Sequence, residues 1–481
     1  MNAIQLWKLF HRPGARGSSG HISALAVIAF AAATAIFLTV LGGVHGFLTR
    51  ASADGTLRCL VNQAACAPGA QERWSHRIVN PDDIAYYASN YVVLAIFACI
   101  LLVVPFVSLA GSAARLAASR RDQRLAALRL AGASQGQVMA LAALDATGQA
   151  LLGALFGISV YAAGMPLIML LSFQGTHFTL AELWVGPLAL LVTVLGVTLL
   201  ALVSSLLTLR RVAITPLGVT ARHSQPLPAK WRAVVFVAVF VVALAALGNM
   251  QLFSGLGTVA VYAISFGFIA LPFALVNLIG SWLVAARVRA KARHPKDAAT
   301  MIAVRRILDN PKRAWRNVSG IALAVFIAGL TSIASFFSEA GGSATDSAAA
   351  IFFRDIGTGG LLTLVFAAVL AAVSSGVMQA GSVYDQANEY RMLVLEGTDT
   401  RTLNRARFIE VLMPIKTVVV VGAACSFALM MPMFAQAMTS PGTLLSFAGG
   451  IALCFALVSF GALASNRVAA RLNLADYRAD D

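Results

Sequence analysis

The chain contains ten apolar runs that are each long enough to cross a lipid bilayer, and this feature limits its fold more than any other. A helix needs about 20 residues to cross a hydrocarbon core that is roughly 30 Å thick. Only 12% of the 481 residues are charged, whereas a soluble chain has about 25%. We therefore expect an all-α polytopic membrane protein with ten transmembrane helices at 22–48, 91–114, 138–171, 183–209, 232–250, 257–286, 317–338, 357–383, 408–435 and 443–465.

The Lys and Arg residues are distributed unevenly between the two sides of these spans. Of the 36, 30 lie in the N-terminal segment, the connections after even-numbered spans and the C-terminal segment; five lie on the opposite side, and Lys416 lies within a span. Because cytoplasmic segments carry the excess of Lys and Arg, both termini are predicted to be cytoplasmic. The formal charge of +16 then reflects topology and attraction to membrane lipid, and nucleic acid is not an expected partner.

A short polar segment occurs twice, each time between two predicted spans. The first copy reads RLAALRLAGASQGQVMALAALDA (124–146) and the second reads EYRMLVLEGTDTRTLNRARFIEV (389–411). When the copies are superimposed, four pairs of similar residues coincide: Leu128 with Leu393, Leu130 with Leu395, Gly132 with Gly397, and Asp145 with Glu410. The recurrence predicts two parallel four-helix repeats, each with an equivalent cytoplasmic turn.

This repeat divides the chain into three parts. Residues 1–215 form the first repeat, with a surface helix, spans one to four and an outside loop at 49–90. Residues 216–295 hold a linker and the two central spans, and residues 296–481 form the second repeat with its own surface helix. The outside connection at 339–356 is expected to be a short linker or a membrane-surface helix. Cys59 and Cys66 share the loop 49–90, where an oxidising compartment would favour a disulfide.

The two polar segments resemble the FtsX/MacB-like permease family of ABC transporters, whose helix reads like REIALLRALGAS. The first copy keeps Ala127, Leu128, Arg129, Leu130, Gly132, Ala133 and Ser134, but has Arg124 where an acidic residue is usual. The second copy keeps Glu389 and Gly397 and departs at Val394, Thr398 and Asp399. Ten spans with both termini inside are most similar to the BceB-like permeases, without the large extracellular domain that those proteins carry between spans seven and eight.

The resemblance implies that each turn docks onto a dimeric ABC ATPase on the cytoplasmic face. A glycine can end a helix in a left-handed conformation, which exposes carbonyl groups for a partner. The expected docking residues are Arg121, Arg124, Leu128, Arg129 and Gly132 in the first turn and Glu389, Leu393, Glu396 and Gly397 in the second. The alternative for the arginines is that they only hold the helix at the lipid headgroups.

The chain has no phosphate-binding motif of the form GxxxxGKS or GxxxxGKT and no recognisable catalytic set of side chains. We therefore expect a non-catalytic permease subunit with no cofactor and no metal of its own. ATP and Mg would be bound by the separate ATPase subunit.

Four polar residues within or beside the predicted spans are candidates for function, because polar groups are costly in the membrane. They are Asp145, Asn277, Glu410 and Lys416. Each also has a purely structural explanation. Asp145 and Glu410 suit the N-terminal ends of helices. Lys416 can extend toward the headgroups, and Asn277 can bond to a neighbouring helix. A close-packing helix face is expected at Gly148, Gly153 and Gly157.

The resemblance further implies that this permease couples ATP hydrolysis to the export or outer-leaflet extraction of a hydrophobic or amphipathic substrate by mechanotransmission in a bacterial cell membrane. A peptide, antibiotic, lipid or haem-like molecule would fit. The alternative is an FtsX-type regulatory protein that controls a cell-wall hydrolase or signalling partner through the loop 49–90. An ion-coupled carrier is a third, less attractive possibility, because Asp145 and Glu410 lie near the membrane interface.

Overall fold

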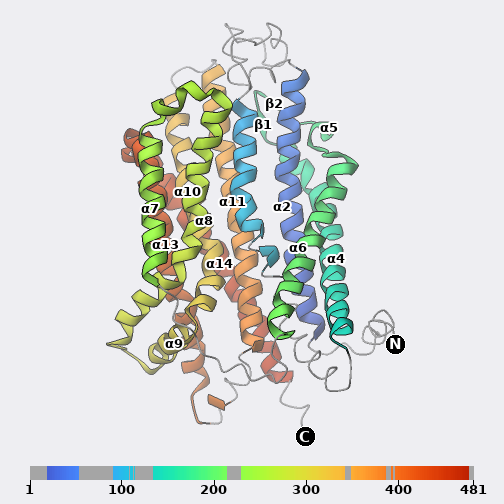
Figure 1. Ribbon diagram of the computed structural model, residues 1–481, viewed down its shortest axis with the longest axis vertical. Coiled ribbons are helices and arrows are strands. Elements are labelled where there is room, and N and C mark those ends of the chain that lie inside the picture. The colour runs from blue at the N-terminus through green and yellow to red at the C-terminus, as the bar shows by residue number, and fades with distance from the viewer. Residues whose placement is uncertain are drawn as a thin grey trace.

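The computed structural model describes residues 19–53, 90–113 apart from 108 and 112, 134–213, 229–341, 348–385, 392–393 and 396–475. Over these residues the protein is a bundle of long helices that run side by side (Figure 1). Sheet is limited to one short hairpin in the described part of the chain. The predicted all-α polytopic fold is therefore confirmed.

Every predicted span corresponds to a long helix within the described residues. The helices are α2 (Ser19–Ala53), the helix Asn90–Gly111, α4 (Gln135–Met169), α6 (Gly186–Ala213), α7 (Ala229–Gly248), α8 (Thr258–Ala292), α10 (Pro311–Gly341), α11 (Ala348–Asp385), α13 (Thr400–Thr439) and α14 (Pro441–Ala475). The connection predicted at 339–356 is shorter than expected, because residues 348–356 already belong to α11.

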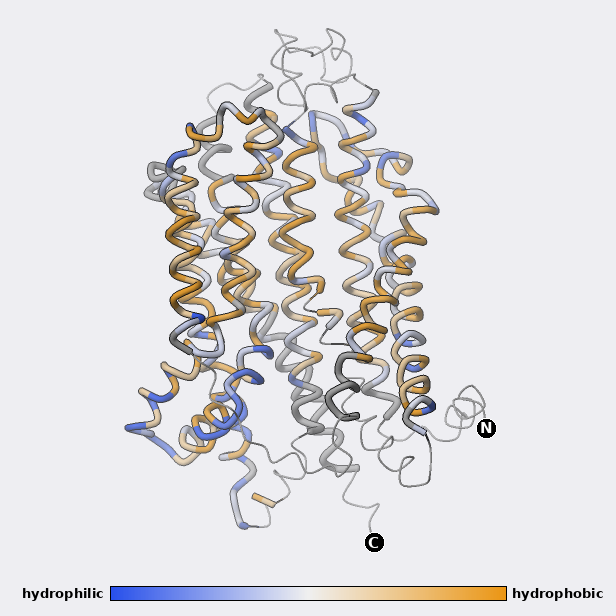
Figure 2. The backbone as a smooth tube through the Cα atoms, in the orientation of Figure 1, coloured by the Kyte–Doolittle hydropathy of each residue, from blue (hydrophilic) through white to orange (hydrophobic). Residues whose placement is uncertain are grey.

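Eight of these helices are individually long and apolar enough to cross a membrane. Helix α8 supplies a ninth span if its two parts, Ala260–Val276 and Leu278–Ala292, count together across a bend of 43°. The shorter apolar part of α14, Pro441–Leu457, lies at the tenth predicted position. Hydrophobic residues fill the middle of the bundle, and hydrophilic residues gather at the lower left, over α9 and the adjoining end of α8 (Figure 2).

Short elements lie at the two ends of the bundle. Strands β1 (Ser172–Phe173) and β2 (Thr176–His177) form an antiparallel hairpin, which is followed by α5 (Leu180–Leu183). The amphipathic helix α9 (Ala298–Asp309) lies at the opposite end (Figure 1), and η3 (Met250–Leu256) connects α7 to α8. We use the names hairpin end and α9 end for these two ends.

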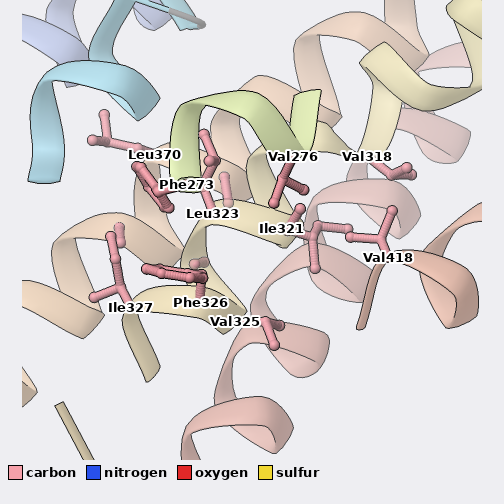
Figure 3. Close-up of a cluster of buried hydrophobic side chains, with 14 of the residues drawn as sticks. Phe273, Val276, Val318, Ile321, Leu323, Val325, Phe326, Ile327, Leu370 and Val418 are labelled. Atoms are coloured by element: carbon pink, nitrogen blue, oxygen red, sulfur yellow. The ribbon is translucent and has the colours of Figure 1, made fainter. Parts of the chain in front are cut away.

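Helix α10 is the centre of the apolar core. It packs against α8, α9, α11, α13 and α14, and 78% of its most apolar stretch of 18 residues is buried. Its residues Ile321, Leu323 and Phe326 meet side chains from three of those helices (Figure 3). On α8, Gly280 leaves room for the ring of Trp315, which an added β carbon would overlap.

The expected glycine face of α4 is present where α4 crosses α2. An added β carbon on Gly157 would lie 2.8 Å from the carbonyl oxygen of Ala31 and 2.6 Å from Cβ of Thr34, and one on Gly153 would overlap Phe30. Two of the three expected glycines therefore pack closely. The third, Gly148, has open space around its α carbon and does not belong to that face.

Helices α13 and α10 make the same contact elsewhere in the bundle. An added β carbon on Gly422 would lie 3.1 Å from the carbonyl oxygen of Ala322 and 3.4 Å from Cβ of Val325. In both contacts a glycine faces one carbonyl oxygen and the β carbon three residues later. Gly157 and Gly422 are also separated by the same number of residues as Gly132 and Gly397.

Candidate functional site

The turn that precedes α13 has the left-handed conformation expected at Gly397. The φ angle of Gly397 is +89°, and the N–H of Thr398 donates to the carbonyl oxygen of Leu393 at 2.9 Å. This pairing, from the second residue past the helix to the third from its end, is a Schellman motif. Both Glu396 and Gly397 are exposed, and nothing lies within 4 Å of a β carbon built on Gly397. The turn is therefore open to a partner.

The remaining residues of the expected docking turns lie outside the described residues. They are Arg121, Arg124, Leu128, Arg129 and Gly132 of the first turn, and Glu389 of the second. The helix that follows the first turn is defined. The backbone N–H of Gln137 donates to the hydroxyl of Ser134, and its side chain accepts from the N–H of Ser134 at 3.0 Å. This capping box fixes where α4 begins, and the spacing Ser-x-x-Gln was its signal in the sequence.

Two ion pairs connect α9 to the first turns of α13. Arg405 lies 3.0 Å from Asp297, which immediately precedes α9, and Arg306 lies 3.9 Å from Glu410. The apolar face of α9 is buried, and α9 packs against α8 and α13. The helix that follows the turn at Gly397 is therefore held to the surface helix through charge and apolar contact together.

The structure places the expected intramembrane polar residues in different surroundings. Glu410 lies 3.9 Å from Arg306. Asp145 accepts a long hydrogen bond of 3.5 Å from Gln149, whose amide also lies 3.4 Å from the hydroxyl of Ser23 on α2.

Two further candidates stay predictions. Lys416 is exposed on the surface of α13. The side chain of Asn277 lies outside the described parts of the structure, as do Cys59 and Cys66. The backbone of Asn277 lies at the bend between the two parts of α8.

At the hairpin end, a buried arginine that the sequence analysis did not select organises a polar cluster. Arg50, near the end of α2, is only 3% exposed. Its Nε lies 2.9 Å from Oε1 of Glu182, its Nη2 lies 3.3 Å from Oε2, and its guanidinium group lies 4.2 Å from the ring centroid of Phe178. A bidentate pair of this kind is strong and directional.

The other donors of Arg50 hold the hairpin. They donate to the carbonyl oxygens of Phe173 and His177, both at 2.9 Å, and to the side-chain oxygen of Gln174 at 3.3 Å. All five guanidinium N–H groups therefore have acceptors. Gln174 has a φ of +58°, an unusual value for a residue with a side chain, and with Gly175 at +74° it makes the two-residue turn between the strands.

A second buried charge connects this cluster to α11. Asp355 is 2% exposed and accepts hydrogen bonds from the hydroxyl of Tyr91 at 2.7 Å and from the backbone N–H of Gln174 at 2.6 Å. Its other carboxylate oxygen has no hydrogen-bond partner in the described structure and lies 3.9 Å from Nε of Arg354. Residues from α2, the helix Asn90–Gly111, the hairpin and α11 thus meet at one point. We name Arg50, Tyr91, Gln174, Glu182 and Asp355 the hairpin-end cluster.

Comparison with known proteins identifies one segment of the chain. The FtsX-like permease C-terminal family matches residues 93–217, which include most of the helix Asn90–Gly111, the first predicted docking turn, α4 and α6. This segment is similar to the FtsX-like permeases. Searches of curated proteins and of solved structures found no match.

The match supports a membrane permease component of an ABC-type system, and the long apolar helices support a multi-pass membrane protein. Members of this family are generally non-catalytic subunits that associate with an ABC ATPase. The match covers about a quarter of the chain and includes the first of the two polar segments. The glycine contact of Gly422 shows that the second group of helices contains the same local geometry as the matched one.

Proposed function

We propose that this permease passes the motion of a separate, dimeric ABC ATPase from its cytoplasmic turns to the hairpin end, and so exports or extracts a hydrophobic or amphipathic substrate. The observation that carries this proposal is the exposed Schellman turn at Gly397, which is followed directly by a long helix. The α9 end is then cytoplasmic and the hairpin end is outside.

A continuous path of packed elements supports this direction of coupling. Helix α13 packs against α10, α10 packs against α11, and α11 carries Asp355 into the hairpin-end cluster. A shift of α13 relative to α10 would therefore change the position of Asp355 relative to Gln174. Both ends of the path are fixed by directional contacts, and its middle is fixed by close apolar contact.

The outer connections favour a substrate taken laterally from the membrane. Helix α10 ends at Gly341 and α11 begins at Ala348, which leaves too few residues for a folded binding domain between them. Peptide, antibiotic, lipid and haem-like substrates all fit this route.

A direct test is to purify the chain with its companion ATPase and to compare Gly397→Trp with Gly257→Trp. Both glycines have positive φ angles and open space around the added side chain, so the two substitutions impose similar backbone strain. Gly257 lies between η3 and α8, away from the α9 end. We expect Gly397→Trp to weaken ATPase binding at least tenfold, and Gly257→Trp to leave binding unchanged. Equal binding by both variants would remove the basis for the proposal.

A second candidate function follows from the position of residues 54–89, which connect α2 to the helix Asn90–Gly111. Arg50 lies just before this loop, and Tyr91 lies just after it, so both its ends adjoin the hairpin-end cluster. A regulatory permease could use that arrangement to present the loop to an extracellular cell-wall hydrolase or signalling partner. Replacing residues 56–87 with a Gly-Ser linker distinguishes the two functions: loss of partner capture with retained transport favours regulation, and the reverse favours transport.

A further inference from the structure

A segment of the central helices carries an unusual concentration of unpaired positive charge. At the end of α8 and just after it, five cations are all exposed, and none of their side chains has an ion-pair or hydrogen-bond partner among the described residues: Arg287, Arg289, Lys291, Arg293 and Lys296. We name residues 287–296 the basic arm. It contains no Asp or Glu.

Two cations close to the basic arm are, in contrast, paired within the protein. Arg306 lies near Glu410, and Arg405 lies 3.0 Å from Asp297, the nearest acid to the basic arm in the sequence. Asp297 is thus already engaged by α13. The unpaired charge of the basic arm therefore needs a partner from outside the described chain, or it remains in water.

The basic arm begins where α8 emerges from its apolar part. Trp282 is 37% exposed on α8, and tryptophan prefers the boundary between hydrocarbon and headgroups. Arg289 follows seven residues later, about 10 Å further along the helix axis. Leu271, nearer the middle of α8, is 48% exposed and would face lipid chains. At about 100° per residue, Arg289 and Arg293 lie within about 20° of Trp282 around the helix axis. One surface of α8 thus offers apolar contact, then an interfacial tryptophan, then two cations.

This surface is supported from behind by apolar contacts. Val288 is 1% exposed and Ala285 is 4% exposed, so the inward side of the same helical turns is buried. Helix α9 covers α8 with its own apolar face, and the bend of 43° sets the direction of the segment Leu278–Ala292. The cations are therefore presented by a fixed helix and not by a free tail.

We propose that the basic arm is a binding site for anionic phospholipids, with the phosphate groups on Arg289 and Arg293 and the acyl chains along the exposed apolar side of α8. This order of apolar, interfacial and cationic groups matches a phospholipid from its chains to its headgroup. An acidic protein surface would use the charge but would leave the adjoining apolar side without a partner. The site is independent of the function proposed above, because a lipid can bind whether or not an ATPase docks.

The test uses the full chain in neutral detergent and titrates it with dioleoylphosphatidylglycerol, with dioleoylphosphatidylcholine as the uncharged comparison. Binding is followed by the shift of the thermal unfolding midpoint and by native mass spectrometry of retained lipid. The test variant is Arg289→Gln/Arg293→Gln. The matched control, Arg305→Gln/Arg401→Gln, removes two other exposed cations that have no partner among the described residues.

We expect the test variant to lose roughly 30-fold in apparent affinity for phosphatidylglycerol, since each basic residue near an anionic surface contributes about 1 kcal/mol. The control should lose far less, and a charge-preserving variant, Arg289→Lys/Arg293→Lys, should bind like the wild type. Equal losses in the test and control variants would show that only net charge matters and would overturn the site. Unchanged lipid affinity with weaker binding of the ATPase would overturn it as well and would assign the basic arm to a protein partner.

Discussion

The two groups of helices that contain the equivalent glycines are held together in different ways. In the group of α10, α11, α13 and α14, the central helix α10 has 78% of its most apolar stretch of 18 residues buried. The corresponding helix of the other group, α2, has only 44% of its stretch buried, although its contact with Gly157 has the same form as the contact of α10 with Gly422.

The central helices α7 and α8 explain much of this difference. Helix α8 packs against α10 and α13, and α7 packs against α13, so the central pair enlarges the core around α10. The group of helices around α2 is instead stabilised at its hairpin end by Arg50. This residue donates two hydrogen bonds to Glu182 and three to the hairpin. The comparison shows that similar local contacts can be stabilised by apolar burial in one place and by a buried polar network in another.

The largest effect is expected from Arg50→Met, which disrupts the buried polar network at the hairpin end. The variant leaves the buried carboxylate of Glu182 without its ion-pair partner, so the free energy of unfolding should fall by about 3–5 kcal/mol. Thermal unfolding in detergent measures the loss. The control is Arg354→Met, whose side chain is 59% exposed and which should change stability by less than about 1 kcal/mol. A loss for Arg50→Met no greater than that of the control would show that the network contributes little.

The next effect compares Gly157→Ala with Gly422→Ala. A β carbon on Gly157 would lie 2.6–2.8 Å from atoms of α2, so α4 must move, at an expected cost of about 1–3 kcal/mol. On Gly422 the corresponding distances are 3.1–3.4 Å, and alanine also restricts the unfolded chain, so that substitution should be close to neutral. Unfolding of both variants under the same detergent conditions gives the difference. Equal destabilisation would mean that the two contacts are equally tight in the membrane.

A smaller effect is expected from Tyr91→Phe, which removes a hydrogen bond to Asp355 without changing the shape of the ring. The loss should be about 0.5–1.5 kcal/mol in unfolding free energy. Combining it with Asp355→Asn in a double-mutant cycle isolates the coupling between the two side chains. If the losses in unfolding free energy of the two single variants simply summed in the double variant, a direct hydrogen bond between Tyr91 and Asp355 would be contradicted.

The smallest effect is expected from Arg306→Gln at the α9 end. The pair with Glu410 is long, at 3.9 Å, and partly exposed, so its loss should change stability by less than about 1 kcal/mol. The variant Glu410→Gln should behave in the same way, and both should become indistinguishable from the wild type in high salt. A loss as large as that of Arg50→Met would mean that the α9 end is as dependent on charge as the hairpin end.

Length and apolarity allowed the helices to be predicted, because a bilayer imposes a minimum run of hydrophobic residues. Gly397 could also be assigned a left-handed conformation, since glycine adopts it without the penalty of a β carbon. The close contacts of Gly153 and Gly157 followed from the need for small residues where helices cross in a membrane. The docking role of Gly397 stays a prediction.

The hairpin-end cluster could not be predicted in the same way. Arg50 lies at the end of an apolar run and was counted only as one of the charges outside the membrane. Asp355 was assigned to a loop, because the charged pair Arg354 and Asp355 interrupts the apolar run at the start of α11. Their meeting depends on a short hairpin around Gln174, whose only signal is the dipeptide Gln-Gly. Hydropathy detects long apolar segments, whereas this cluster depends on contacts between residues far apart in the chain.

The paired glycine contacts also bear on how the chain could be divided. Each contact lies wholly within one group of helices, α2 with α4 and α10 with α13, and neither crosses residues 214–228. Two separately synthesised polypeptides, ending at 213 and beginning at 229, would each keep its own glycine crossing and could reassociate through Tyr91, Gln174 and Asp355. Such a split permease would make the association of its two halves a measurable binding equilibrium.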